Sequence, residues 1–202
     1  MARPVTQQER RRDIVEAALA LLAEDEATVG IREVAHRLNL TPNAVRYYYR
    51  DAGELLWAVR ERVEERFLTA RIEALAETDD PAEQLARTMG AGLPSGPHDV
   101  EWRVTFRPVL SGRVTPDLGH TINEVFFRQV AIYQRILEHG TASGVFVPSL
   151  PIEDIARTLM IMEDYQGLRI VTFDPAFDRS GALRLMREYV RQVTGAQVPE
   201  IE

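Results

Sequence analysis

The chain has 202 residues, of which 45% are hydrophobic and 27% are charged, with 12 glycines and 11 prolines. This is the composition of an ordinary globular protein, and it excludes collagen, low-complexity disorder and a coiled-coil rod. The absence of cysteine excludes disulfides, thiolate metal sites and a cysteine nucleophile. The N-terminus lacks the apolar stretch of a signal peptide, and no apolar run approaches the roughly 18 to 20 residues of a membrane-spanning helix. We therefore expect a cytoplasmic protein with no membrane partner.

The charges are distributed unevenly along the chain. The formal net charge is −7 at pH 7, and all 24 basic residues are arginines. Residues 1–50 contain eight arginines against seven acidic residues, whereas residues 51–202 contain 16 arginines against 24 acidic residues. Affinity for nucleic acid follows local neutralisation of phosphates, so the near-neutral N-terminal part can bind DNA although the whole chain is acidic. Arginine also favours bidentate contacts over attraction between point charges.

The first part of the chain predicts four helices, at about residues 7–24, 31–38, 42–49 and 51–77. Thr6 and Glu9 form a capping box at the start of the first helix. Thr41 followed by Pro42 is an N-cap with proline at the first helical position. One long helix followed by two short ones, with about four residues between the short ones, predicts a helix-turn-helix.

The remainder of the chain continues in helices and shows no strand pattern. The fourth helix has an apolar inner face that consists of Leu55, Leu56, Val59, Val63, Phe67 and Leu75. Five further helices are expected at about residues 82–90, 99–111, 117–139, 152–173 and 179–194, separated by segments with glycine and proline. We expect an all-α protein of about nine helices, with a helix-turn-helix domain over residues 1–50 and a second helical domain over residues 51–202.

The second short helix is the one that enters the major groove in helix-turn-helix proteins, so the residues that it exposes matter most. Arg46 can bind guanine O6 and N7 bidentately, and Asn43 can bind adenine N6 and N7 in the same manner. The hydroxyl of Thr41 and the free backbone donors beside it can bind a phosphate. These residue types therefore indicate a DNA-reading surface.

Three consecutive tyrosines occupy positions 47–49. Their hydroxyls can reach phosphates, but the rings can equally pack under the following long helix. A short helix cannot bury all three, so we expect Tyr47 and Tyr48 outside, whereas Tyr49 suits the core as well as DNA.

Residues 11–57 resemble the DNA-binding domain of the tetracycline-repressor (TetR) family of bacterial transcription regulators. The chain has G-I-R-E-V-A at 30–35, where the family has a variant of T-V-R-D-I-A. It has N-L-T-P-N-A-V-R-Y-Y-Y-R-D-A-G-E-L at 39–55, where the family has a G-V-S-x-G-T-L-Y-x-Y-F-x-S-K-E-E-L core. The resemblance implies a homodimeric regulator, most often a repressor, that binds a palindromic double-stranded DNA operator. The phosphate and base contacts of the family fall here on Arg32, Thr41, Pro42, Asn43, Arg46, Tyr47 and Tyr48.

Three positions depart from the family pattern. Asn43 stands where glycine is usual, and it is able to read a base instead of approaching the DNA backbone. Arg46 replaces the usual tyrosine, which favours a guanine contact. Ala52 replaces the lysine that grips a phosphate, so Arg50 or the arginines of the N-terminal tail would substitute for it.

The second domain resembles, more loosely, the ligand-binding half of the choline-responsive betaine-pathway repressors of that family. The resemblance rests on L-E-H-G at 137–140, G-V-F at 144–146 and the helix that follows. It implies a small-molecule effector, whose binding releases the operator, and a four-helix dimer interface. The candidate interface residues are Ile122, Val125, Phe126, Gln129, Ile136, Ile155, Leu159 and Met162.

The candidate effector pocket combines large apolar side chains with a few charged ones. Its residues are Met89, Trp102, Arg103, Phe106, Phe127, Tyr133, Met160, Glu163, Asp164 and Tyr165. Apolar and aromatic groups of this kind line ligand pockets, but each is also compatible with ordinary core packing. Glu163 and Asp164 beside aromatic rings would suit a cationic ligand, and the charged residues are equally compatible with a solvated surface or a salt bridge between subunits.

Two other classes of protein compete with a regulator. A helical enzyme is disfavoured because the chain lacks the zinc-protease, P-loop and nucleophile-elbow motifs and has no paired-carboxylate frame. We therefore expect no catalytic residue, and no metal or cofactor, since the four histidines show no metal spacing. A helical interaction module without DNA binding is favoured by one feature, the alanine at position 52.

Overall fold

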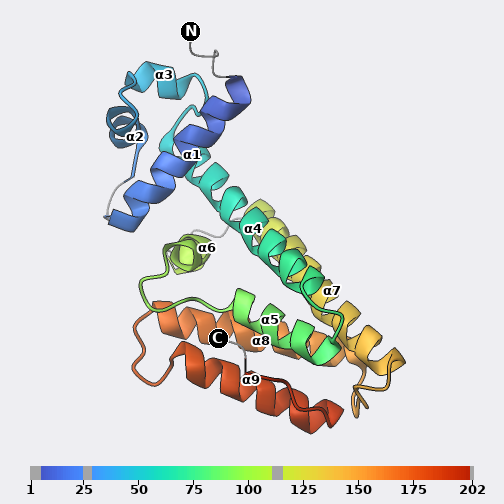
Figure 1. The fold of residues 1–202 in the computed structure, drawn as a ribbon. Coiled ribbons are helices and arrows are strands. Elements are labelled where there is room, and N and C mark those ends of the chain that lie inside the picture. Colours follow the sequence, from blue (N-terminus) through green and yellow to red (C-terminus); the bar gives the residue numbers. More distant parts are fainter. Residues whose placement is uncertain (1–5, 25–28, 111–115, 201–202) are drawn as a thin grey trace. The chain divides into compact units, whose positions relative to one another are not determined.

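A computed structural model describes residues 6–24, 29–110 and 116–200 (Figure 1). This part of the chain forms nine α-helices and no β-strand, which confirms the all-α prediction. The helices are α1 (Gln7–Glu24), α2 (Ile31–Arg37), α3 (Pro42–Arg46), α4 (Ala52–Ala76), α5 (Pro81–Gly92), α6 (Val100–Leu110), α7 (Pro116–Ala142), α8 (Ile152–Val171) and α9 (Arg179–Thr194). None of the helices described here is long and apolar enough to cross a membrane.

α1 and α3 begin at the predicted capping residues. In α1 the N–H of Glu9 donates to the hydroxyl of Thr6, and the N–H of Thr6 donates to the Glu9 carboxylate. Before α3 the hydroxyl of Thr41 accepts the N–H of Ala44 at 3.1 Å. These contacts satisfy backbone donors that the first helical turn leaves without a partner.

α3 is shorter than the helix predicted over residues 42–49. It ends at Arg46, and Tyr47 and Tyr48 continue as a turn. The reason lies in the start of α4, because the N–H of Arg50 donates to the carboxylate of Glu54 at 2.8 Å instead of continuing the hydrogen bonds of α3.

The chain divides into two compact units, Met1–Glu65 and Arg66–Glu202, and the division falls inside α4. In the first unit α2 packs against both α1 and α3. Asn39 makes the tight turn between α2 and α3, with a φ of 53° in the left-handed region. The core of this unit includes Ile14, Ala18, Val34, Ala35, Val45, Tyr49, Leu55 and Val59. Compactness does not show which residues bind DNA or a ligand, so the functional boundary at residue 50 stays a prediction.

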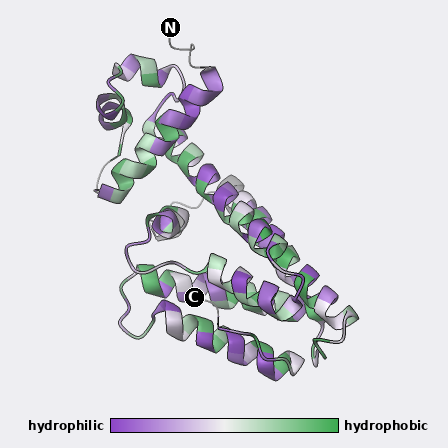
Figure 2. Cartoon of the chain, in the orientation of Figure 1, coloured by the Kyte–Doolittle hydropathy of each residue, from purple (hydrophilic) through white to green (hydrophobic). Residues whose placement is uncertain are grey.

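In the second unit α7 packs on α5 and α8, and α8 also packs on α6 and α9. α8 and α9 lie side by side in Figure 1, and Figure 2 shows that each of them carries both hydrophobic and hydrophilic residues. Their hydrophobic residues meet in one core, whose most buried members include Leu85, Met89, Tyr133, Leu137, Ile155, Leu159, Met186 and Val190. Most polar residues of these helices remain at the surface, but Glu163 and Gln166 of α8 are buried.

The segment after α7 is held by packing and backbone hydrogen bonds. Phe146 is buried against Gly140, where a Cβ would overlap the phenyl ring. The N–H of Val147 donates to the carbonyl of Thr194 at 2.9 Å, which ties this connection to the end of α9. Gly140 and Phe146, two of the residues that carry the looser resemblance, therefore have a structural role here.

Candidate functional site

The residues predicted to contact DNA lie on or beside the helix-turn-helix. The exposed ones are Arg32, Thr41, Asn43, Arg46, Tyr47 and Arg50. Pro42 and Tyr48 are half-buried. The three tyrosines thus take different environments, since Tyr47 is 74% exposed and Tyr49 is 3% exposed. Tyr49 is a core residue.

Asn43 and Arg46 form a pair on the exposed side of α3. The Nη1 of Arg46 donates to the Oδ1 of Asn43 at 3.2 Å. The Nε and Nη2 of Arg46 have no partner among the described residues. They form the other edge of the guanidinium, and that edge can donate two parallel hydrogen bonds.

Arg50 is paired within the chain. Its Nε lies 3.1 Å from the carboxylate of Glu54, which also accepts the N–H of Arg50. The backbone N–H and then the guanidinium lower the pKa of Glu54 below its usual value. Arg50 is therefore a cation with a carboxylate beside it, and a phosphate would have to compete with that carboxylate.

Arg11, on α1, has a structural role beside the helix-turn-helix that was not predicted from the sequence. Its Nη1 donates to the carbonyl of Tyr48 at 3.1 Å, and its guanidinium carbon lies 4.6 Å from the centre of the Tyr49 ring. The hydroxyl of Tyr49 donates in return to the carbonyl of Arg11 at 3.4 Å. Arg11 thus braces α1 against the end of α3, and the cluster of tail arginines gave no signal of this role.

The second site is a buried cluster of polar side chains in the second unit. The guanidinium of Arg71, on α4, forms an ion pair with the carboxylate of Glu163, on α8, and both side chains are 1% exposed. The hydroxyl of Tyr133, on α7, donates to the other oxygen of Glu163 at 2.6 Å. The guanidinium carbon of Arg71 also lies 5.6 Å from the centre of the Tyr133 ring, within the range of a cation–π interaction.

The charges in this cluster shift one another's pKa values. Burial would lower the pKa of Arg71, but Glu163 and Tyr133 outweigh burial and raise it. Burial, and then the Glu163 carboxylate, raises the pKa of Tyr133 well above its usual value. Burial and then Glu163 also raise the pKa of Asp164 to about 7, although Arg71 opposes the shift. At neutral pH the cluster therefore holds a charged guanidinium and a neutral tyrosine, with Asp164 close to its midpoint.

Arg71 was not among the predicted site residues, although the sequence contains a signal for it. Val63, Phe67 and Leu75 were assigned to the inner face of the fourth helix, and position 71 continues that spacing of four residues. A charged residue on an apolar face must find a buried partner, and that requirement could have singled out Arg71.

The structure brings together part of the predicted effector set. Trp102 stacks on Phe106 with ring centres 5.0 Å apart, and it lies over Gly167, one helical turn along α8 from Glu163. Met89 and Met160 are buried in the same unit. Phe127 and Tyr165, however, are 55% and 57% exposed, and the guanidinium of Arg103 lies over the exposed ring of Phe173. These last three residues do not line the buried cluster.

Several buried polar atoms of this region have no hydrogen-bond partner among the described residues. They are Nε and Nη1 of Arg71, Nε1 of Trp102, Oγ1 of Thr88 and both amide atoms of Gln166. A buried polar group without a partner costs about 1 to 3 kcal/mol. A ligand that supplied the missing partners would therefore be favoured here.

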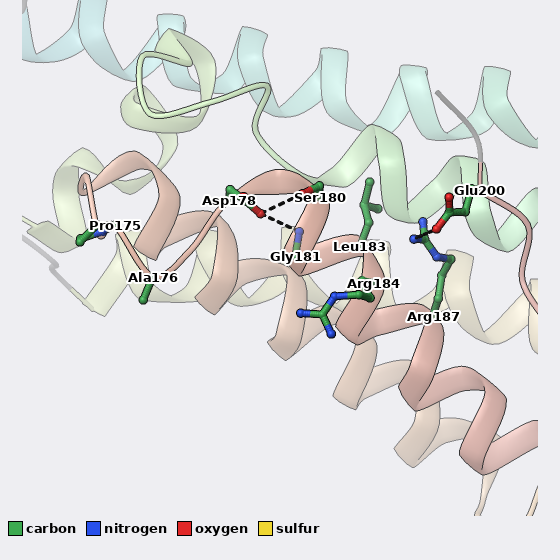
Figure 3. A pocket seen from close by; sticks show the side chains of 9 residues that line it. All are labelled: Pro175, Ala176, Asp178, Ser180, Gly181, Leu183, Arg184, Arg187 and Glu200. Carbon is green, nitrogen blue, oxygen red and sulfur yellow. Dashed lines mark hydrogen bonds and ion pairs between the residues drawn. The ribbon is translucent and has the colours of Figure 1, made fainter.

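Two surface hollows lie elsewhere in the second unit. One, of about 580 Å³, lies along the start of α9, and Figure 3 shows that polar groups in it are already paired. Asp178 accepts from Ser180 and Gly181, and Arg187 donates to Glu200 at 2.6 Å. The other, of about 490 Å³, lies between the segment before α6 and the α8–α9 connection. Neither hollow is lined by a predicted effector residue.

The predicted dimer residues fall into two groups. Ile136, Ile155 and Leu159 are buried in the chain's own core and do not lie on a free surface. The half-buried ones are Ile122, Val125, Phe126, Gln129 and Met162. The apolar stripes predicted on α7 and α8 thus point partly toward the interior, because the two helices pack against each other.

At the level of sequence, no protein-family model and no curated relative matches the chain. Solved structures are similar in fold. A putative transcriptional regulator from Saccharomonospora viridis, in complex with choline, has a TM-score of 0.81 and 20% identity, covering 93% of this chain and 99% of that one. A TetR transcription regulator from Haloarcula marismortui has a TM-score of 0.80 and 22% identity, with the same coverage. The regulator FadR from Bacillus subtilis, in complex with stearoyl-CoA, has a TM-score of 0.67 and 17% identity, covering 95% and 99%.

Proposed function

We propose that this chain, which has the fold of the TetR family of transcriptional regulators, is itself a DNA-binding transcriptional regulator. In this proposal it binds a palindromic operator as a homodimer, acts as a repressor and is released by a small-molecule effector. The observation that carries the proposal is the free edge of the Arg46 guanidinium on the exposed side of α3. A helix-turn-helix that presents such an edge has the donors that a guanine requires.

Asn43 has a supporting part in this recognition. Its Oδ1 already accepts from the Nη1 of Arg46, so the amide orients the guanidinium and leaves Nε and Nη2 for guanine O6 and N7. Asn43 is therefore proposed to position Arg46, with its own amide N–H₂ still available as a donor. Tyr47, which is fully at the surface of the turn, is proposed to contact the DNA backbone.

The homodimer is proposed to form through α8 and α9. Ile161 and Tyr165 stand four residues apart on α8 and are 54% and 57% exposed, and Leu185 of α9 is 46% exposed. α8 and α9 pack against each other within the unit, and the exposed apolar side chains of the two helices favour burial against a partner. A second copy of the chain is the proposed partner, and half-buried Met162 would adjoin the interface.

Effector binding is proposed at the cluster of Arg71, Tyr133 and Glu163. The similar proteins were solved with ligands as different as choline and stearoyl-CoA, so the ligand of this chain must follow from its own residues. This choice of site is supported by the buried polar atoms of the same unit that lack hydrogen-bond partners among the described residues.

The DNA-binding proposal is tested by fluorescence anisotropy with labelled DNA from the flanks of the chain's own gene. Arg46→Ala should weaken binding by about 1 to 3 kcal/mol and relax the preference at one base pair, because it removes a bidentate donor. Arg135→Ala, an exposed arginine of α7, is the matched control and should bind like the unmodified chain. A folded, dimeric protein that binds none of this DNA at low salt would refute the proposal.

A further inference from the structure

We infer that Glu163 and the ring of Tyr133 form a seat for an organic cation whose resting occupant is the guanidinium of Arg71, and that a small guanidinium or ammonium compound acts by displacing it. This inference rests on the proposed function, because it names the effector class and the first step of its action. It also revises the expectation that a cationic ligand binds a free Glu163 carboxylate, because Arg71 of the same chain is already paired with that carboxylate.

The seat has the two components that hold an organic cation. Glu163 is buried and uses one oxygen for Arg71 and the other for the hydroxyl of Tyr133. The face of the Tyr133 ring lies 5.6 Å from the guanidinium carbon. A carboxylate together with an aromatic face attracts a guanidinium or an alkylammonium ion by charge and by the ring quadrupole.

Arg71 is held by few of the contacts that it could make. Of its three guanidinium nitrogens, Nη2 has a partner, whereas Nε and Nη1 have none among the described residues. Glu163 and Tyr133 outweigh the desolvation of the charge, but two buried guanidinium nitrogens still lack an acceptor, and each unmet donor has a cost. An incoming cation would keep the ion pair with Glu163, while Arg71 would regain hydrogen bonds to water on leaving.

The cluster has room for one cation at a time. Gly92 of α5 lies so close that a Cβ there would overlap both the Glu163 carboxylate and the Arg71 guanidinium. On α8, Gly167 is likewise covered by the Trp102 ring. Binding of a second cation must therefore remove the first, which makes the process a competition.

Asp164 places a partly ionised carboxyl beside the seat. It is half-buried and adjacent to Glu163, and its pKa of about 7 reflects burial and the Glu163 carboxylate, which Arg71 opposes without cancelling. The partly ionised carboxyl of Asp164 beside Glu163 attracts a further cation and repels an anion. The charges of the cluster thus favour a cationic competitor over an anionic or a neutral one.

Displacement of Arg71 would break the buried ion pair between two helices. The Arg71–Glu163 pair joins α4 to α8, and α4 is the helix that also contributes Leu55 and Val59 to the core of the first unit. Loss of the pair leaves α4 without its buried ionic contact to α8, and this is the proposed signal of the effector.

The test uses n-propylguanidinium, which copies the end of an arginine side chain, and n-propylurea, which has nearly the same shape without the charge. Binding to the full chain is measured by isothermal titration calorimetry at concentrations far below those that denature proteins. Arg71→Met removes the resident cation, so its apparent Kd for propylguanidinium should fall by about tenfold or more, because the seat is no longer occupied. Arg66→Met is the matched control on α4 and should bind like the unmodified chain, since Arg66 pairs with Glu101 instead.

Propylurea should not bind any of these proteins, and Glu163→Gln should abolish binding of propylguanidinium. If Arg71→Met is unfolded in buffer, propylguanidinium should restore its folding, as followed by circular dichroism, and propylurea should not. Equal affinity of the unmodified chain and Arg71→Met, equal binding of the urea, or a variant that neither binds nor is restored would overturn the inference.

A DNA-binding measurement separates this inference from the proposed function. Propylguanidinium should lower the affinity of the unmodified chain for its DNA, and it should not do so for Glu163→Gln. Competition at Glu163 in a protein that never binds DNA would refute the regulator and retain the seat. DNA binding that ignores propylguanidinium, in a protein with no competition at Glu163, would refute the seat and retain the regulator.

Discussion

The chain has no lysine, so its basic side chains that form hydrogen bonds and ion pairs are arginines. Arg11 donates to a backbone carbonyl and lies over Tyr49, Arg71 pairs with a buried carboxylate, and Arg179 donates to three carbonyls. A guanidinium has five donors on a planar frame, so one side chain can serve several acceptors at fixed angles. A lysine ammonium would retain the charge at these sites and lose the geometry.

Asp164 predicts a pH dependence of stability. Its pKa is 3.8 in the absence of the fold and about 7 in the folded chain, so the folded state holds the extra proton between these values. Stability therefore falls as pH rises from about 4 to about 7. Asp164→Asn should remove this fall and stabilise the protein at pH 7.5 by about 1 to 3 kcal/mol, less than the full shift would imply because the carboxyl is partly exposed.

The measurement is urea unfolding at fixed protein concentration across that pH range. Asp174 provides a control of opposite sign, because a backbone hydrogen bond from Ala176 and then Arg169 lower its pKa. Asp174→Asn should be less stable than the unmodified chain at neutral pH, and the difference in stability should be smaller in acid. An Asp164→Asn variant with the same pH profile as the unmodified chain would contradict the shift.

At the scale of elements, α5 ends on a side chain from α9. The guanidinium of Arg179 donates to the carbonyls of Gly90, Leu93 and Pro94 at 2.8, 2.6 and 3.2 Å. Carbonyls at the end of a helix have no partner within it, and a cation there also complements the helix dipole. The start of α9 and the end of α5 are thereby fastened to each other.

Arg179→Ala should lower the free energy of unfolding by about 2 to 3 kcal/mol, because charge-assisted hydrogen bonds to three carbonyls are lost. Chemical denaturation measures the change. Arg184→Ala, an exposed arginine on the same helix, should cost less than about 0.5 kcal/mol. Equal effects of the two substitutions would show that the carbonyl contacts contribute little.

At the scale of the whole molecule, the proposed homodimer depends on apolar side chains that the folded chain leaves exposed. Ile161 and Tyr165 of α8 and Leu185 of α9 remain exposed, although both helices contribute buried residues to the core. Exposed apolar patches of this kind mark association sites. The two half-sites of a palindromic operator require two helix-turn-helix domains, and a homodimer would supply them.

If the proposed dimer forms through α8 and α9, Ile161→Glu should convert it to a monomer, because a charge without a partner would be buried in the interface. Sedimentation velocity gives the mass of the particle in solution. Ile72→Glu, which replaces an isoleucine of α4 that is 60% exposed, should leave the dimer intact. A dimeric Ile161→Glu variant would place the interface on another surface.

The sequence predicts the starts of the helices better than it predicts which residues meet at the candidate sites. The starts of α1 and α3 followed from Thr6 and Thr41, since a cap and its acceptor lie within three residues of each other. The predicted effector set included Tyr133 and Glu163 but missed Arg71, and it included Phe127, which is exposed. Periodicity shows which side of a helix is apolar, but it does not show which other helix that side meets.

The sequence by itself therefore determined the order of the helices, the all-α class and the residue types on α3, the second short helix of the helix-turn-helix. These properties can be inferred from caps, breakers and spacing within a few positions, although packing is still needed to stabilise helices as short as α2 and α3. Tertiary structure alone decided that Tyr49 is in the core while Tyr47 is at the surface, and that Arg71 meets Glu163, 92 residues away in the chain. The physical reason is that burial and ion pairing are properties of the space between elements, and local sequence does not specify that space.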